Sequence, residues 1–268
     1  MQELKRVLRD NPELVDLIGY EDSLRALHVS EEEDEADKRS ILRTMFTRIM
    51  LLNKEMVARA LGKMKLRLQE THLLNEKEQL VLTLEKQYPG DVGVISSLFF
   101  NYIKLKPGEA LYLGANEPHA YISGDCVECM ATSDNVVRAG LTSKHLDVKT
   151  LCSMLSYKQG FPEILNGCKL TAYVWRYIPP FDEFEVDKCV LPLGKSTVFP
   201  AIPGPSLYLI TSGEGQMEAD GAVLRIAEGD VLFAVANNEI LITASLDLHC
   251  YRAGLNSRVF QNVVGLEC

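Results

Sequence analysis

The chain has 268 residues, of which 47% are hydrophobic and 24% are charged, and its formal net charge is −9. These values are typical of an ordinary globular protein with a substantial core, and the negative charge argues against a nucleic-acid surface. No apolar run approaches the roughly 20 residues of a membrane span, and the charged start MQELKRVLRDNPEL is unlike a signal peptide. We therefore expect neither a membrane nor a nucleic-acid partner.

Residues 1–88 are predicted to form a helical domain. Asn11 and Pro12 suit the start of a helix, because proline fits the first turn. Ser30 with Glu33 matches a capping box, which predicts that the acidic run EEEDEAD opens a helix. Apolar residues then recur at helical spacing along one stripe: Ile41, Met45, Ile49, Leu52, Met56 and Ala60. This stripe is predicted to pack against a neighbouring domain.

A second capping box, Asn75 with Glu78, begins a shorter helix that the turn Tyr88-Pro89-Gly90-Asp91 ends. After this turn, short strand-like runs alternate with Gly, Pro and Asp turns: FFNYIKL, ALYL, HAYI, NVVRAGL and LTAYVW. One helix is predicted among them, where apolar residues recur from Val148 to Leu155. From Lys169 onward nearly all of the chain is predicted as strand and turn, which indicates a β-sandwich or small barrel.

The cysteines are scattered through the chain: Cys126, Cys129, Cys152, Cys168, Cys189, Cys250 and Cys268. An odd number of cysteines without a signal peptide indicates reduced thiols and a cytoplasmic protein. Cys126 and Cys129 form a CxxC pair, which raises zinc binding or redox chemistry as an alternative. Because no second pair stands at zinc-ribbon spacing, buried structural thiols are the favoured interpretation.

An internal repeat links PGEALYLGANEPH, Pro107–His119, with EGDVLFAVANNEI, Glu228–Ile240. Each copy has a glycine–acid turn, a strand and an Ala-Asn turn, so the chain is predicted to hold two copies of one β unit. Ile240 stands in the second copy where His119 stands in the first. The exchange indicates a chemical role confined to the first copy, although divergence without function would leave the same pattern.

The stretch PGEALYLGANEPHAY resembles the second conserved motif of cupins, in which a strand after a glycine turn delivers a metal-binding histidine into a jelly-roll barrel. The longer stretch Tyr88–Thr142, which includes HAYISGDCVECMATSDNVVRAGLT, is closely similar to type I mannose-6-phosphate isomerase. The resemblance covers essentially the whole chain and implies a mainly β fold with an α-helical region. It implies a helical domain at 1–88, the C-terminal part of a first, catalytic cupin unit at 89–160, and a second, degenerate cupin unit at 161–268. The first of the two jelly-roll units is expected to be incomplete.

The resemblance implies a zinc-dependent isomerase that interconverts mannose 6-phosphate and fructose 6-phosphate and supplies mannose for GDP-mannose synthesis. By resemblance, His119 of EPHAY is the zinc ligand, and Arg138 of VVRAGL is the expected key charged contact. Asp134, Glu128 and Lys144 are expected beside Arg138 in the active site, and the identity of the base is left open. A serine in LTSK replaces the family's usual proline next to Lys144. The remaining histidines are given no role: His28, His72, His145 and His249.

These residue types suit the chemistry of such an isomerase. Moving a carbonyl between C1 and C2 requires a base within hydrogen-bond reach of the proton, a cation for the phosphate or oxyanion, and a metal that polarises the carbonyl. If residues 134–138 are extended, Asp134 and Arg138 point to the same face and could reach one cavity. Without the resemblance, a surface ion pair beside an ordinary turn would be the favoured interpretation of these two residues.

The expected zinc ligand set is incomplete in this chain. The family binds zinc through four side chains, and besides the EPHAY histidine these come from a Gln-x-His pair and a Lys-Pro-Glu glutamate, neither of which occurs here. One imidazole cannot hold zinc tightly, because catalytic sites use about three protein ligands. Three explanations are open. The chain is a fragment or alternative product of a complete enzyme, which is favoured; an inactive cupin-like pseudoenzyme that binds sugar phosphate or a partner; or a subunit whose first cupin unit a partner chain completes.

Overall fold

The computed structural model of the protein describes residues 1–133 and 136–260. Its contacts divide the chain into two compact units. The helical unit comprises Met1–Lys104, Leu113–Ile122 and the described part of Asp134–Phe161. The jelly-roll unit comprises Leu105–Tyr112, Ser123–Ser133 and the described part of Pro162–Cys268. The segment between the helices and the main β region therefore contributes to both units.

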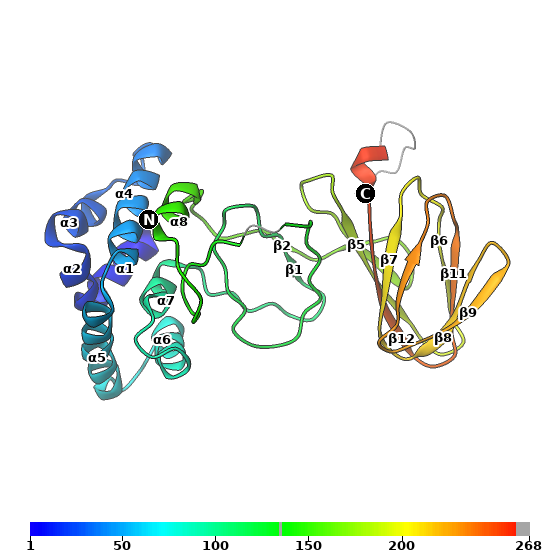
Figure 1. The fold of residues 1–268 in the computed structure, drawn as a ribbon, viewed down its shortest axis with the longest axis horizontal. Helices are drawn as coiled ribbons and strands as arrows, with labels where there is room; N and C mark the ends of the chain where they lie inside the picture. Colours follow the sequence, from blue (N-terminus) through cyan, green and yellow to red (C-terminus); the bar gives the residue numbers. More distant parts are fainter. Residues whose placement is uncertain (134–135, 261–268) are drawn as a thin grey trace. The chain divides into compact units, whose positions relative to one another are not determined.

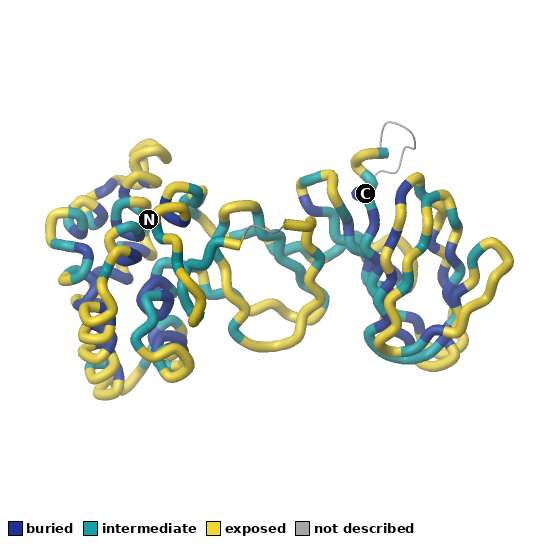
Figure 2. Tube along the Cα trace, in the orientation of Figure 1, coloured by how far each residue is buried: buried dark blue, intermediate teal, exposed yellow. Residues whose placement is uncertain are grey.

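The helical unit is built from short and medium helices (Figure 1), with one main apolar core and a smaller apolar cluster between α4 and α8. Its helices are α1 Gln2–Asp10, α2 Pro12–Ile18, α3 Tyr20–His28, α4 Glu35–Met50, α5 Lys54–Glu70, α6 Glu76–Gln87, α7 Val92–Ser96, the 3-10 turn η1 Ser97–Phe99, and α8 Val148–Met154. Figure 2 shows that the buried residues of these helices alternate with exposed ones, as expected for amphipathic helices. In the described part of the chain, no helix combines the length and the apolar character needed to cross a membrane.

The predicted helix starts are confirmed at one capping box and wrong at the other. The box of Asn75 with Glu78 is present at the start of α6, where the Asn75 side chain accepts a hydrogen bond from the Glu78 backbone N–H. At the other, the Glu33 carboxylate does accept the Ser30 backbone N–H at 2.9 Å, but the Ser30 hydroxyl accepts from the Glu32 rather than the Glu33 backbone N–H, so this segment closes a local turn. Helix α4 begins only at Glu35. The acidic run is therefore divided between a turn and a helix start.

The predicted apolar stripe is interrupted between α4 and α5. Asn53 caps α5 by accepting a hydrogen bond from the Met56 backbone N–H at 2.8 Å, which restarts the helix in a new rotational phase. Met56 is consequently exposed rather than buried. The side chains that α5 buries are Val57, Ala60, Leu61, Met64 and Leu68. The single long stripe was wrong because it assumed one unbroken helix.

The jelly-roll unit contains two antiparallel sheets packed around a second core (Figure 1). Its main strands are β4 Val174–Tyr177, β5 Glu185–Leu191, β6 Ser196–Phe199, β7 Ser206–Ser212, β8 Glu214–Ala219, β9 Ala222–Ala227, β10 Val231–Ala234, β11 Ile240–Ala244 and β12 Leu248–Gly254. One sheet has the order β10-β7-β12-β5-β4-β3, with β3 at Cys168–Lys169, and the other has the order β6-β11-β8-β9. Of the strands β5–β12, each sheet holds four, and the chain crosses from one sheet to the other after every strand except β8, which pairs with β9; this is the jelly-roll arrangement. The 3-10 turn η2, Ser257–Phe260, follows β12.

The predicted fold class, mainly β with a helical region, is confirmed. In β5 and β12 every second residue is buried, which matches strands with one face on a core. The strand-like runs predicted between residues 99 and 141 were mostly wrong, since within the described residues only β1, Ala110–Leu111, is a strand there. It pairs with β2, Ile164–Leu165. A strand forms only where a neighbour shares its ladder, and the described residues provide no other partner.

The two predicted copies of the β unit share unusual backbone angles at equivalent positions. Gly108 and Gly229 both have φ of +91°, and Asn116 and Asn237 have φ of +62° and +65°. These left-handed conformations favour glycine and asparagine, so the matching residue types have a common geometric cause. The similarity supports the interpretation that one β unit was duplicated.

The acid of each glycine–acid turn also makes the same hydrogen bond in both copies. Glu109 and Asp230 each accept a bond of 2.8 Å from the backbone N–H three residues earlier. The copies differ where the histidine stands: Ile240 is buried at the start of β11, whereas His119 is exposed. The shared turns therefore support a common scaffold, while the environment of the final residue differs.

Candidate active site

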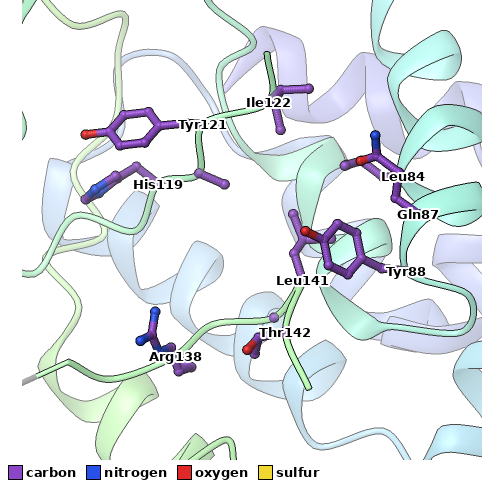
Figure 3. A pocket seen from close by; sticks show the side chains of 11 residues that line it. Leu84, Gln87, Tyr88, His119, Tyr121, Ile122, Arg138, Leu141 and Thr142 are labelled. Atoms are coloured by element: carbon purple, nitrogen blue, oxygen red, sulfur yellow. The ribbon is translucent and has the colours of Figure 1, made fainter. Parts of the chain in front are cut away.

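A cavity of about 300 Å³ lies in the helical unit and is lined by three segments of the chain (Figure 3). The end of α6 contributes Leu84, Gln87 and Tyr88; a second segment contributes residues 119–122; and a third contributes Arg138, Gly140, Leu141 and Thr142. This volume is at the lower end of the range for small-molecule sites. The cavity brings His119 and Arg138 to one surface, although they lie 19 positions apart in the sequence.

His119 follows Pro118 in a segment without regular secondary structure. The backbone carbonyl of Glu117 accepts a hydrogen bond from its Nδ1 at 3.0 Å. Because a carbonyl can only accept, Nδ1 carries the proton, and Nε2 of the neutral ring keeps its lone pair. The ring also lies 5.7 Å from that of Tyr121, centroid to centroid. A backbone carbonyl on one ring nitrogen is the usual support of a metal-binding or proton-accepting imidazole.

Arg138 is held between two residues that face a core. Val137 and Ala139 pack against a small apolar cluster formed by Phe46, Met50, Leu151 and Cys152 of α4 and α8. Arg138 lies between them and lines the cavity instead, as Figure 3 shows. This alternation is that of an extended chain with one face buried. The guanidinium consequently presents planar N–H donors to the cavity, which suits the oxygens of a phosphate or an oxyanion.

The other predicted site residues do not line this cavity in the described structure. Glu128 is exposed and belongs to the jelly-roll unit. Lys144 is exposed two residues beyond Thr142, whose hydroxyl accepts a hydrogen bond from the Lys144 backbone N–H at 3.1 Å. Asp134 lies outside the described residues. The structure thus brings together His119 and Arg138, and roles for the other three residues stay predictions.

Polar lining residues that the sequence reasoning missed are Gln87, Tyr88, Tyr121 and Thr142. Each adjoins a motif that was singled out: Tyr88 begins the YPGD turn, Tyr121 follows the EPHA run, and Thr142 ends VVRAGLT. Their positions show that these motifs meet around one space. The only indication of these residues in the sequence was their position beside a motif, and that position does not show which side chains face the cavity.

The described residues alone do not fit a zinc site. Within residues 1–133 and 136–260, no group of three or more His, Cys, Asp or Glu side chains could hold a metal ion. His119 would supply one ligand of the three or more that a catalytic zinc requires. Cys126 and Cys129 are free, and burial raises the pKa of the Cys129 thiol, which disfavours the thiolate that metal or redox chemistry needs.

Comparison with known proteins identifies the group to which this architecture is similar. Residues 17–100 match the family model described as phosphomannose isomerase type I, helical insertion domain. Mannose-6-phosphate isomerase 2 of Arabidopsis thaliana is 56% identical over 267 residues, which cover 98% of this chain. Mannose-6-phosphate isomerase of Bos taurus is 37% identical over 270 residues, which cover 94% of this chain. The chain is therefore similar to type I phosphomannose isomerases over almost all of its length.

A solved phosphomannose isomerase has the same fold. The Salmonella typhimurium mannose 6-phosphate isomerase, bound to its substrate (f6p) and zinc, superposes with a TM-score of 0.74 at 24% identity over 95% of this chain. The chain spans 60% of the length of the Arabidopsis isomerase, 63% of the bovine one and 61% of the Salmonella structure. The predicted resemblance to type I mannose-6-phosphate isomerase is thereby confirmed, for a chain that spans about three fifths of these relatives.

Proposed function

We propose that this chain takes part in the interconversion of mannose 6-phosphate and fructose 6-phosphate, as a mannose-6-phosphate isomerase that supplies mannose for GDP-mannose synthesis. The observation that carries the proposal is the meeting of His119 and Arg138 at one cavity. The identity of 56% with an Arabidopsis mannose-6-phosphate isomerase supports the same substrate class. The sugar phosphate would occupy this cavity.

Arg138 is the proposed contact for the anionic part of the substrate. Its guanidinium can donate two parallel hydrogen bonds to a phosphate or to the oxygens of an enediolate. Aldose–ketose isomerisation takes a proton from the carbon beside the carbonyl and returns it to the neighbouring carbon, so a base must lie within hydrogen-bond reach. Asp134, Glu128 and Lys144 are the proposed further members of the site. His119, whose Nε2 keeps its lone pair, is the proposed contribution of this chain to metal binding.

The proposal includes a second source of metal ligands. Because the described residues bring only His119 to a metal, no step of the reaction is assigned to zinc. The relatives are longer than this chain, so we propose that residues equivalent to the part it does not span complete the site. These residues would belong either to the same protein or to a partner chain. The same completion would supply partners for the strands of the first cupin unit.

The proposed organisation has a helical domain at 1–88, the C-terminal part of the catalytic cupin unit at 89–160, and a second cupin unit at 161–268. A cytoplasmic location is part of the proposal. All the cysteines that the structure describes are free, even Cys189 and Cys250, which are buried and face each other across β5 and β12. Free thiols so placed are consistent with a reducing compartment.

The test compares residues 1–268 with the same chain supplemented by the segment of the Arabidopsis isomerase that it does not span. Bound zinc, mannose 6-phosphate affinity and isomerisation would be measured for both. The supplemented protein is expected to bind zinc and turn over substrate.

Arg138→Ala should weaken mannose 6-phosphate binding by about 10- to 150-fold, the loss typical of a hydrogen bond to a charged group. Arg138→Lys should retain part of the affinity.

Arg225→Ala is a matched control, because Arg225 is an exposed arginine of β9 in the jelly-roll unit. It should leave affinity and turnover unchanged. Sugar-phosphate binding that depends on Arg138, without turnover in the supplemented protein, would favour an inactive cupin-like remnant instead. Binding that is unaffected by Arg138→Ala would refute the proposed site.

A further inference from the structure

The carboxylate of Asp91 joins two segments of the helical unit that are distant in the sequence. Its Oδ1 accepts hydrogen bonds from the backbone N–H of Gly93 at 2.6 Å and of Leu141 at 2.8 Å, and its Oδ2 lies 3.5 Å from the backbone N of Thr142. The first bond caps α7, and the others hold the loop that follows Arg138. One side chain therefore fixes a helix start and a cavity wall together.

Two glycines allow these segments to approach closely. A Cβ placed on Gly140 would lie 2.6 Å from the Cα of Gly93, and one placed on Gly93 would lie 2.6 Å from the backbone N of Leu141. Both obstacles are backbone atoms, which cannot turn aside as the end of a flexible side chain can. Gly140 also has φ of +133°, a conformation that L side chains rarely adopt. The contact thus depends on glycine at both positions.

The loop held by Asp91 has a conformation that it would not adopt freely. Leu141 has φ of +51°, which is unfavourable for a residue with a side chain, and its side chain both packs against the core of the helical unit and lines the cavity (Figure 3). On the other side of Arg138, Val137 is anchored in the smaller cluster with α4 and α8. Arg138 therefore lies between an apolar anchor and a hydrogen-bonded anchor.

We propose that Asp91 is a positioning residue for Arg138. With Gly93 and Gly140, it fixes the backbone of 140–142 on the start of α7, and through that backbone it sets where the Arg138 guanidinium meets the substrate. The inference rests on the proposed function, because it takes Arg138 as the contact for a sugar phosphate. It assigns a role to a residue that does not line the cavity itself.

The test measures mannose 6-phosphate affinity and amide hydrogen exchange in the full chain. Asp91→Ala should weaken binding about tenfold and speed exchange of the Leu141 amide at least about tenfold. Asp91→Asn keeps an acceptor of the same size and should restore most of both. Gly140→Ala displaces the loop with the carboxylate intact, and it should weaken binding as well. In an Arg138→Ala background, Asp91→Ala should cause no further loss of affinity, whereas a general loss of structure would weaken binding in either background.

Asp147→Ala is the matched control. Asp147 also caps a short helix of the same unit, since its side chain accepts a hydrogen bond from the Thr150 backbone N–H at 3.0 Å. This variant should leave affinity and Leu141 exchange unchanged. If Arg138→Ala weakens binding but Asp91→Ala and Gly140→Ala do not, the positioning role is overturned and the proposed function stands. If Arg138→Ala itself binds like the wild type, the proposed function fails together with the inference.

Discussion

Replacing Asp187 by alanine should destabilise the jelly-roll unit strongly, because this carboxylate neutralises the buried Arg252 and the partly buried Arg176. Asp187 is fully buried on β5. It accepts hydrogen bonds from Arg176 Nε at 2.7 Å and Nη2 at 3.0 Å, and from Arg252 Nη1 at 2.7 Å. Glu185 supplies the second carboxylate, 3.0 Å from Arg176 Nη1. The cluster thus has two positive and two negative charges, which cancel.

The magnitude follows from what the substitution leaves behind. Without Asp187, the buried Arg252 and the partly buried Arg176, whose side chain is 11% exposed, share the Glu185 carboxylate, which lies 3.8 Å from Arg252 Nη1. Within the described residues, Arg252 Nη2 already lacks a hydrogen-bond acceptor, so the arginine would have little compensation. Removing one partner of a buried pair costs roughly 3–5 kcal/mol in the free energy of unfolding. Since a domain is stable by about 5–15 kcal/mol in total, this loss should be a large fraction of the unit's stability.

Denaturant unfolding followed by tryptophan fluorescence measures this loss. The chain has one tryptophan, Trp175, on β4 beside the cluster, so its emission reports the jelly-roll unit alone. Asp187→Asn keeps the side-chain volume and should lose less stability than Asp187→Ala. Glu214→Ala is the control, because Glu214 pairs with Arg225 on the exposed surface of the same unit at 2.6 Å. The midpoint of that control should be close to the wild-type value.

A fall of less than about 1 kcal/mol for Asp187→Ala, or a fall no larger than that of Glu214→Ala, would refute the reasoning. Such a result would mean that water reaches the guanidiniums after the substitution. It would also mean that the four charged side chains do not act as one unit.

Other predictions concern the helical unit and are measurable by helix circular dichroism or NMR. Met45→Ala removes a fully buried side chain and should lower the free energy of unfolding by roughly 2–5 kcal/mol. Leu66→Ala, at a mostly exposed position, should change the free energy of unfolding little. Equal effects of the two substitutions would contradict the assignment of Met45 to the core. Asn75→Ala removes a capping-box acceptor and should cost about 1 kcal/mol, and an unchanged midpoint would argue against the cap. The hydrogen bond from the Thr150 hydroxyl lowers the pKa of Asp147 below its ordinary 3.8. The stabilisation of α8 by the ionised Asp147 should therefore be fully present above pH 3.8 and be lost as the pH falls through the lowered pKa of the folded state. An NMR titration of Asp147 with a midpoint at or above 3.8 would contradict this.

Features that depend on neighbouring residues were predictable from the sequence. The box at Asn75, the helix at Val148–Met154 and the turn at Gly229 each follow from a few adjacent side chains. The Ser30 box was wrong for a related reason, since the same local groups can close a turn as readily as they start a helix. Local chemistry therefore indicated where the chain changes direction more reliably than which element follows.

The contacts that build the candidate site could not be predicted in this way. Asp91 bonds to Leu141 across 50 residues, and nothing in either segment alone indicates the other. The resemblance indicated His119 and Arg138 as site residues. The two contacts that flank Arg138, the apolar packing of Val137 and the hydrogen bond of Leu141 to Asp91, depend on how α4, α7 and α8 pack. Tertiary packing decided these positions, and periodicity carries no information about it.

The duplicated β unit explains why the proposed chemistry is confined to one copy. In the second copy the residue after the shared turns, Ile240, enters β11, which pairs with both β6 and β8 and is closed over by the jelly-roll core. In the first copy His119 has no such ladder among the described residues and lines a cavity. The same β unit therefore places a buried core residue, Ile240, where neighbouring strands cover it, and an accessible imidazole, His119, where no described strand covers it. On the proposed function, the residues that complete the metal ligands of His119 would also complete the strands around it, so zinc binding and folding of the first cupin unit should occur together.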